Sequence, residues 1–147
     1  SKGFDREILN LKIDKFNLSF LPLICYEIIY SGKLFDNNKF DYIINISEDG
    51  WFGKSIGPKQ HFAHSIYRSI ESGKYIIRSA NNGISAIINP NGTIENQLKF
   101  GTTGYIDFTE SKTIKNTLFS KYGNKIFIIL ILLYIFLIFS FNKIIDE

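Results

Sequence analysis

The sequence predicts an α/β domain followed by one C-terminal transmembrane helix. Short apolar runs that end in turn residues alternate with one longer helical stretch, which is the pattern of buried strands and a covering helix. Near the end of the chain, Ile126 to Asn142 contains no charged residue. The 147 residues are 45% hydrophobic, which is enough for one domain with a core and too apolar for a disordered chain.

The first part of the domain contains two predicted buried strands. Leu18 to Ile24 is a mostly apolar run that leads directly into Cys25, and Tyr42 to Ser47 is a second run of this kind. Between them, we expect a short helix over Glu27 to Phe35.

A longer helix is predicted to begin at Gly57-Pro58, because proline is favoured in the first turn of a helix. Phe62, Ile66 and Ile70 then recur every four residues, and Gly73 is a suitable stop. The remaining expected strands are short and separated by the turns Asn81-Asn82-Gly83 and Asn89 to Gly92. They cover Tyr75 to Ala80, Ile84 to Ile88, Thr93 to Leu98 and Gly104 to Phe108.

The uncharged C-terminal run favours a membrane-spanning helix. As a helix it is about 25 Å long, slightly short of the roughly 30 Å hydrocarbon core, and the flanking Lys125 and Lys143 can reach the interfaces. The alternative is a buried core helix or strand pair, but such a helix normally has a polar face and this run has none. We therefore divide the chain into a domain (1–110), a polar connector (111–124), a transmembrane helix (125–143) and a tail (144–147).

Composition excludes several classes of function. The net charge is only +3 and the basic residues are scattered, so a nucleic-acid partner is not expected. The single cysteine excludes an internal disulfide. His61 and His64 lie three residues apart, but with one cysteine and no third histidine we expect no metal site. The chain contains no Met, and we expect it to be a fragment of a longer protein.

Cys25 is the main candidate for chemistry. It lies where a predicted strand ends and a helix begins, a position that favours a thiolate and brings the backbone N–H of Tyr26 close as an oxyanion donor. A lone cysteine is also often an inert, buried small hydrophobe. The residues around Cys25 leave these two interpretations evenly balanced.

Several motifs, in order, resemble one family. Leu23 to Ile29 resembles the nucleophile segment of the nitrilase superfamily, and more narrowly that of the apolipoprotein N-acyltransferases. Later segments of the chain also resemble this family, in the same order. They are Asn45 to Gly53 (ending in Trp-Phe-Gly), Gly57 to His61, Arg68, Glu71 to Gly73 and Arg78 to Gly83. The chain departs from the family pattern at Glu48-Asp49-Gly50, where Asn-Asp-Ala is usual, and at Tyr30-Ser31, where Phe-Pro is common.

The resemblance implies a fold and a set of site residues. The fold is the second half of a nitrilase-like αββα sandwich, and the chemistry uses a Glu-Lys-Cys triad in which Cys25 is the nucleophile. The triad Glu and Lys fall before the first residue of this chain, so we expect the chain alone to be inactive. Glu27 matches a supporting glutamate, although a glutamate favoured by a helix N-terminus is the alternative. Tyr26 and Trp51 match substrate-binding residues at the mouth of the site, and the alternative for Trp51 is a packing aromatic beside Gly53.

The function implied is acyl transfer without a metal or organic cofactor. A phospholipid would donate a fatty acyl group to Cys25 as a thioester, and the N-terminal amine of a diacylglyceryl apolipoprotein would accept it. The implied location is the bacterial inner membrane, with the catalytic domain on the periplasmic side. The alternatives are a carbon–nitrogen hydrolase (amidase) with water as acceptor, and an inactive membrane-bound remnant. Arg68 and Arg78 could bind lipid head groups, but ion pairs within the fold are favoured.

Overall fold

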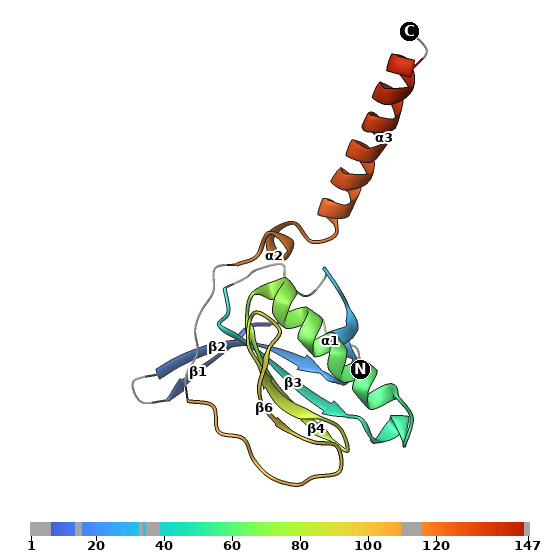
Figure 1. The fold of residues 1–147 in the computed structure, drawn as a ribbon. Coiled ribbons are helices and arrows are strands. Elements are labelled where there is room, and N and C mark those ends of the chain that lie inside the picture. The colour runs from blue at the N-terminus through green and yellow to red at the C-terminus, as the bar shows by residue number, and fades with distance from the viewer. Residues whose placement is uncertain (1–6, 14–15, 33, 35–38, 110–115, 146–147) are drawn as a thin grey trace.

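The computed structural model describes residues 7–13, 16–32, 34, 39–109 and 116–145 (Figure 1). The elements follow along the chain as β1 (Leu9–Ile13), β2 (Phe16–Ile24), the 3-10 turn η1 (Cys25–Ile29), β3 (Tyr42–Glu48), the 3-10 turn η2 (Gly50–Phe52), α1 (Gly57–Ser72), β4 (Tyr75–Asn81), β5 (Ser85–Ile88), β6 (Ile94–Leu98), α2 (Leu118–Tyr122) and α3 (Lys125–Ile145).

The strands form a single six-stranded sheet in the order of the sequence. The three central strands β2, β3 and β4 are parallel, and β1, β5 and β6 are added antiparallel at the two edges. Parallel strands require a crossover, and α1 supplies it between β3 and β4. The carboxyl ends of three parallel strands therefore meet at one edge of the sheet.

Helix α1 lies across one face of the sheet and closes the core (Figure 1). The core cluster joins strand residues to Phe62 of α1, and its buried members are Leu21, Leu23, Ile28, Leu34, Phe40, Ile43, Phe62, Ile76, Ala86 and Ile88. Much of the helix face that meets the sheet is made of the small residues Ser65, Ser69 and Ser72, all buried. Small side chains let the helix approach the strands closely.

On the other face of the sheet, the part at the carboxyl ends of β2 and β3 is exposed to solvent within the described residues. Ile24 and Ile46 are 59% and 56% exposed, although they lie on the two neighbouring parallel strands β2 and β3. The buried residues of β3 alternate with these exposed ones, as the two-residue period of a strand requires. The sheet therefore has one face covered by α1 and a second face with an uncovered apolar patch at the strand ends, whereas Tyr75 and Ile87 are buried.

The predicted α/β architecture is confirmed, with corrections to individual elements. The expected helix over Glu27 to Phe35 is wrong in its described part: the chain makes the short turn η1, after which Tyr30 is extended (φ −74°, ψ 112°), and residues 33 and 35 lie outside the described part. The expected strand over Gly104 to Phe108 is also wrong, since residues 102–109 belong to no helix or strand. Instead, the ring of Phe108 lies 5.1 Å from that of Tyr75 and 5.8 Å from that of Tyr42.

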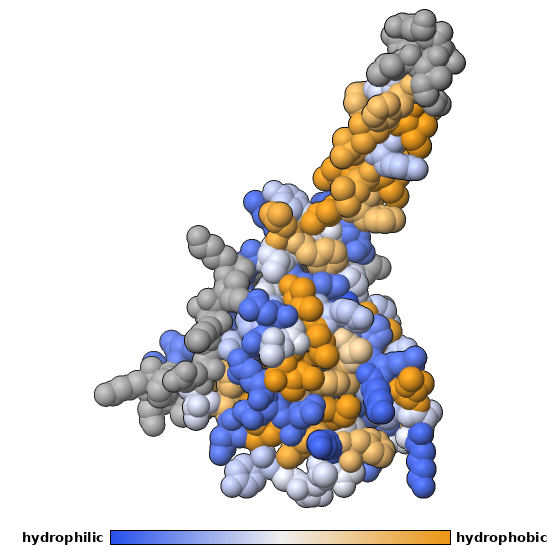
Figure 2. All heavy atoms as spheres, in the orientation of Figure 1, coloured by the Kyte–Doolittle hydropathy of each residue, from blue (hydrophilic) through white to orange (hydrophobic). Residues whose placement is uncertain are grey.

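The C-terminal run forms the helix α3, which extends away from the domain (Figure 1). Every large apolar side chain from Phe127 to Phe141 is between 41% and 70% exposed, so apolar residues cover the visible surface of this helix (Figure 2). No helix in the described part of the chain is both long enough and apolar enough to cross a membrane. The membrane span predicted for residues 125–143 is not confirmed. The connector predicted over 111–124 contains α2, and residues 111–115 of it lie outside the described part.

Candidate active site

The candidate site lies at the sheet edge where the parallel strands end. Cys25 follows β2, Glu48 closes β3 and Asn81 closes β4, and the register places these strand ends side by side. Open α/β sheets bind ligands at this edge, because the strand ends and following loops form a crevice there.

Cys25 has a left-handed backbone conformation, with φ of 49°. This conformation costs a non-glycine residue roughly 1–2 kcal/mol, and such strain is concentrated at functional sites. The half-buried sulfur lies 3.7 Å from Ser47 Oγ and 4.0 Å from the carbonyl oxygen of Glu48. The backbone therefore turns the cysteine sharply at the end of β2 and holds its sulfur against the end of β3.

Glu27 folds back onto the strand end instead of reaching outward. Its Oε2 accepts a hydrogen bond of 2.7 Å from the backbone N–H of Ile24, which is the carboxylate half of a capping box for η1. The carboxylate thus fixes the turn that carries Cys25. This contact matches the alternative of a helix-starting glutamate, and it is also compatible with a supporting role at the nucleophile.

Behind the cysteine lies a buried polar network centred on Asp49, which has no exposed surface. Asp49 Oδ1 accepts hydrogen bonds from Ser47 Oγ at 2.7 Å and from His61 Nδ1 at 2.8 Å. Arg78 Nη2 donates to both carboxylate oxygens, at 3.1 and 2.8 Å. Burial alone raises the pKa of Asp49, but the hydrogen bonds from His61 and Ser47 and the charge of Arg78 outweigh it and hold the pKa below its ordinary value.

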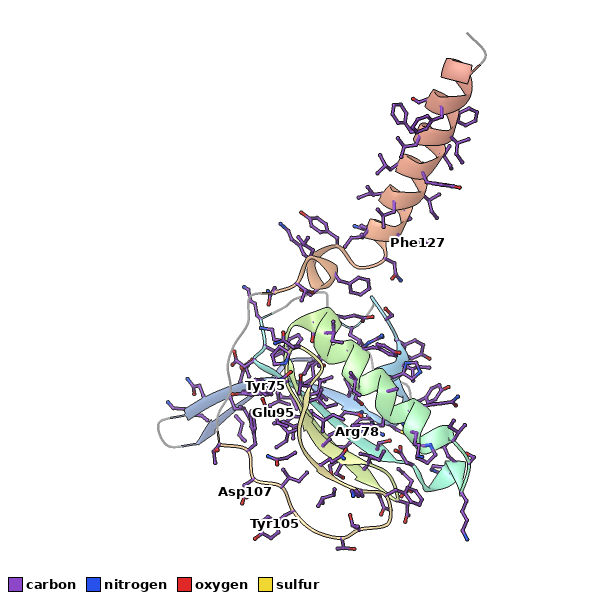
Figure 3. All side chains as sticks on the ribbon, viewed as in Figure 1. Tyr75, Arg78, Glu95, Tyr105, Asp107 and Phe127 are labelled. Carbon is purple, nitrogen blue, oxygen red and sulfur yellow. The ribbon has the colours of Figure 1, made fainter. Side chains whose placement is uncertain are left out.

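Arg78 also connects this network to neighbouring parts of the fold. Figure 3 shows it among the strands beside α1, and its side chain is fully buried. Its Nη1 donates to Asn45 Oδ1 and, at 3.4 Å, to Ser65 Oγ of α1, while Nε donates to the carbonyl of Ile84 at 3.2 Å. Burial lowers the pKa of Arg78, and the neighbouring Asp49 carboxylate opposes that shift. The ion pair favoured for this residue from sequence is confirmed.

Tyr26 and Trp51 lie on the outside of the site. Tyr26 is 55% exposed, and its ring lies 5.7 Å from that of His61 at one side of a pocket of about 330 Å³. The pocket is further lined by Phe52 and by the first turns of α1. Trp51, in η2, is 86% exposed, so the structure does not use it as a packing aromatic.

A second buried ion pair stabilises the loop after η1. Arg68 Nη2 lies 2.8 Å from Glu71 Oε1, which also accepts a hydrogen bond of 2.8 Å from Ser31 Oγ. Arg68 Nη1 donates to the carbonyl of Ile29 at 3.3 Å. Burial raises the pKa of Glu71, while Ser31 and Arg68 oppose the shift. Arg68 therefore holds the fold together and does not face outward for a lipid head group.

From the sequence alone, no role in the site was predicted for Ser47, Asp49, His61 or Arg78. A usable signal was present, because Asn45, Ser47 and Arg78 interrupt two otherwise apolar strand patterns. Polar residues on the covered face of a buried strand must find partners inside the protein. That rule predicts a buried polar cluster, although it does not say which residues pair.

Comparisons with known proteins agree with this geometry. A family model described as carbon-nitrogen hydrolase matches residues 16–113. The apolipoprotein N-acyltransferase of Rickettsia bellii is 46% identical over 137 residues, which is 92% of this chain and 27% of that protein. The enzyme of the same name from Rickettsia prowazekii is 42% identical over 137 residues, or 92% of this chain and 28% of that protein. The chain therefore spans little more than a quarter of the length of these relatives.

Among solved structures, an amidase of the nitrilase superfamily from Nesterenkonia AN1 is similar with a TM-score of 0.46 and 13% identity, covering 65% of this chain and 38% of that one. The family model spans the strands β2 to β6, the cysteine turn and α1 together. On this match, the chain belongs to the carbon-nitrogen hydrolase family.

Proposed function

We propose that this chain supplies the nucleophile of an acyltransferase that moves a fatty acyl group from a phospholipid to the N-terminal amine of an apolipoprotein. The observation that carries the proposal is Cys25, half-buried and left-handed at the end of a central parallel strand. The relatives that cover 92% of the chain are named for this activity.

The chemistry has two steps. The Cys25 thiolate attacks the ester carbonyl of the phospholipid, the C–O bond breaks, and the lysophospholipid leaves with a proton. The apolipoprotein amine then attacks the thioester, the C–S bond breaks and an amide forms, while the proton lost by the amine passes through the general base to the released sulfur. The general base and the second oxyanion donor are the Glu and Lys that the family resemblance implies outside this chain, and no residue here is assigned to those roles.

Residues around the cysteine have supporting roles. The backbone N–H of Tyr26 is a donor for the oxyanion, and Glu27 holds η1 in place through the N–H of Ile24. The exposed rings of Tyr26 and Trp51 bind the substrates at the mouth of the site. In this scheme Glu27 acts through the position of Cys25, and the two aromatic residues act through substrate contact.

The surroundings of the site are proposed to be a bilayer and a second sheet. The exposed apolar surface of α3 supports its insertion as a transmembrane helix (125–143), with the domain (1–110) on the periplasmic side of the inner membrane. The open face with Ile24 and Ile46 supports a second sheet packed against it, which would complete the αββα sandwich.

A chimera tests the proposal. In the Rickettsia bellii enzyme, the matched 137 residues are replaced by those of this chain, and apolipoprotein N-acylation is measured. We expect activity in the chimera and a loss of at least a thousandfold with Cys25→Ala, since the covalent route is removed. With phospholipid and no acceptor, mass spectrometry should find an acyl increment on the Cys25 peptide. Activity that survives Cys25→Ala would contradict the proposal.

The same chimera separates acyl transfer from hydrolysis, which the family description favours as a second candidate. Release of free fatty acid at a rate that is independent of the apolipoprotein would identify water as the acceptor. Transfer that depends on the apolipoprotein identifies the amine.

A further inference from the structure

Ser47 places a hydroxyl between the nucleophile and the buried network. It lies on the covered face of β3 and is 5% exposed. Its Oγ is 3.7 Å from Cys25 Sγ and 2.7 Å from Asp49 Oδ1. A hydroxyl has one hydrogen, so it can donate to the sulfur or to the carboxylate at any moment, and not to both.

While Cys25 is a neutral thiol, the Ser47 hydroxyl is expected to donate to the Asp49 carboxylate. Asp49 is an acceptor held in place by Arg78 and His61, and its lowered pKa keeps it ionised at neutral pH. A neutral thiol is only a weak acceptor, and it can itself donate to the Glu48 carbonyl, whose oxygen lies 4.0 Å from the sulfur. Once the sulfur is charged, it becomes a competing acceptor at the other side of the same hydroxyl.

We propose that Ser47 is a switchable hydrogen-bond donor to the Cys25 sulfur, turning from Asp49 to Sγ whenever the thiolate forms. The inference rests on the proposed function, in which Cys25 is the nucleophile. The thiol proton goes to the general-base carboxylate of the acyl-transfer site, and Ser47 keeps its own proton throughout. Asp49 stays satisfied during the turn, because it retains the hydrogen bonds from Arg78 and His61.

The charged groups around the sulfur include both signs. Burial lowers the pKa of Arg78, and the attraction between Arg78 and Cys25, like that of Asp49, opposes this shift. The Asp49 carboxylate, paired with that arginine and with His61, has the opposite sign.

Two further carboxylates are already bound elsewhere. Glu27 accepts from the N–H of Ile24, and Glu48 accepts from the N–H of Gly50 at 2.6 Å and from Asn81 Nδ2. Because charges of both signs surround the sulfur, we expect a direct hydrogen bond from Ser47 to contribute substantially to the stability of the Cys25 thiolate.

The chain offers matched variants for a test. Ser47→Val and Ser47→Thr have the same shape and differ only in the hydroxyl, and both suit a strand. Ser47→Ala removes the hydroxyl with less bulk. Ser65→Ala is the control, because Ser65 is equally buried and contacts Arg78 of the same network without reaching the sulfur.

The readout is the rate of alkylation of Cys25 by iodoacetamide as a function of pH, measured in the acyltransferase chimera by mass spectrometry of the Cys25 peptide. In Ser47→Val and Ser47→Ala, we expect the midpoint of the rate profile to move up by about one pH unit, the size expected for one hydrogen bond to a charged group. At neutral pH the alkylation rate should then fall about tenfold. Ser47→Thr and Ser65→Ala should keep the original midpoint.

An unchanged midpoint in Ser47→Val and Ser47→Ala would overturn the inference, as would an equal shift in Ser65→Ala. These outcomes are distinct from failure of the proposed function. If acyl transfer survives in Cys25→Ala, the proposed function fails. If the thioester forms on Cys25 but the midpoint of the alkylation profile is the same in the Ser47 variants as in the parent, only the inference about Ser47 fails.

Discussion

At the scale of single residues, the site depends on a buried carboxylate that accepts hydrogen bonds from three side chains. Asp49 has no solvent contact, and Arg78, Ser47 and His61 all donate to it. Gly83 completes this arrangement, because a Cβ at that position would lie 2.3 Å from Asp49 Oδ2. A buried ion pair of this kind is costly to break from one side, because the remaining charge is left without a partner.

Replacing Asp49 by Asn tests this dependence. We expect a loss of roughly 3–5 kcal/mol of unfolding free energy at pH 7, since Arg78 is left buried and unpaired. The pKa of Asp49 is lowered in the fold, so its contribution to stability is complete above about pH 4 and is lost as pH falls through the lowered value. The Asn variant should therefore lose less stability on acidification than the parent chain does.

The measurement is urea unfolding of the chain, followed by circular dichroism between pH 7 and pH 3. Asp107→Asn is the control, because Asp107 is an exposed carboxylate on the loop after β6 (Figure 3). An Asp49→Asn midpoint equal to that of Asp107→Asn would show that the network is not stabilising.

The sequence was sufficient to locate Cys25, but it was not sufficient to predict which side chains contact it. Cys25 could be located because a strand, a cysteine and a turn follow one another in the chain. The contacts of its sulfur with Ser47 and with the carbonyl of Glu48 could not be located, because they depend on the parallel pairing of β2 with β3. Trp51 could be named from its motif, but its exposure depends on how η2 leaves the sheet.

At the scale of elements, strong local signals were read correctly. Helix α1 begins at Gly57 with a proline in its first turn and ends before Gly73, which is left-handed. The stripe of Phe62, Ile66 and Ile70 is only partly a core face. Phe62 is buried and Ile66 packs against the core cluster, whereas Ile70 is 46% exposed and lies beside the turn at Gly92.

Two elements were not foreseen although each has a weak signal. The strand β1 alternates apolar and polar residues but is paired at the edge of the sheet, where Leu9 and Leu11 remain 44% and 47% exposed. The helix α2 starts at Thr117, whose Oγ1 accepts from the N–H of Ser120 at 3.0 Å. Both are short, so their stability comes from tertiary contacts that no local pattern contains.

Helix α3 gives the element-scale prediction. We expect a reporter fused to residues 117–147 to be recovered with membranes after carbonate extraction. Leu132→Asp near the middle of the run should reduce integration, at a cost of about 2.5–3.5 kcal/mol on the insertion scale. Leu118→Asp is the control, because it places the same charge on the exposed surface of α2, outside the run. Recovery of the parent fusion in the soluble fraction would contradict a membrane role for α3.

At the scale of the whole molecule, the site is open on one side. The sheet is covered by α1 on one face, while Ile24 and Ile46 remain exposed on the other, next to the strand ends that carry the cysteine and Glu48. Within the described residues, the groups nearest the sulfur are Ser47 and the Glu48 carbonyl, and neither is a general base. In the proposed function, the chain therefore contributes the nucleophile Cys25 and the groups that hydrogen-bond to it.

This arrangement predicts the behaviour of residues 1–147 when they are expressed alone. Incubated with phospholipid in detergent, the chain should form no measurable Cys25 thioester, because general-base and oxyanion groups each contribute on the order of a hundredfold or more to such a step. Adding the N-terminal remainder of the Rickettsia bellii enzyme as a separate chain should restore thioester formation if it packs against the open sheet face. Ile46→Lys, which places a charge on that face, should prevent the restoration, whereas Lys12→Glu on the edge strand β1 should not. Mass spectrometry of the Cys25 peptide provides the measurement in every case. A thioester formed by residues 1–147 alone, as fast as in the chimera, would show that this chain contains the complete catalytic machinery and that the proposed division of roles is wrong.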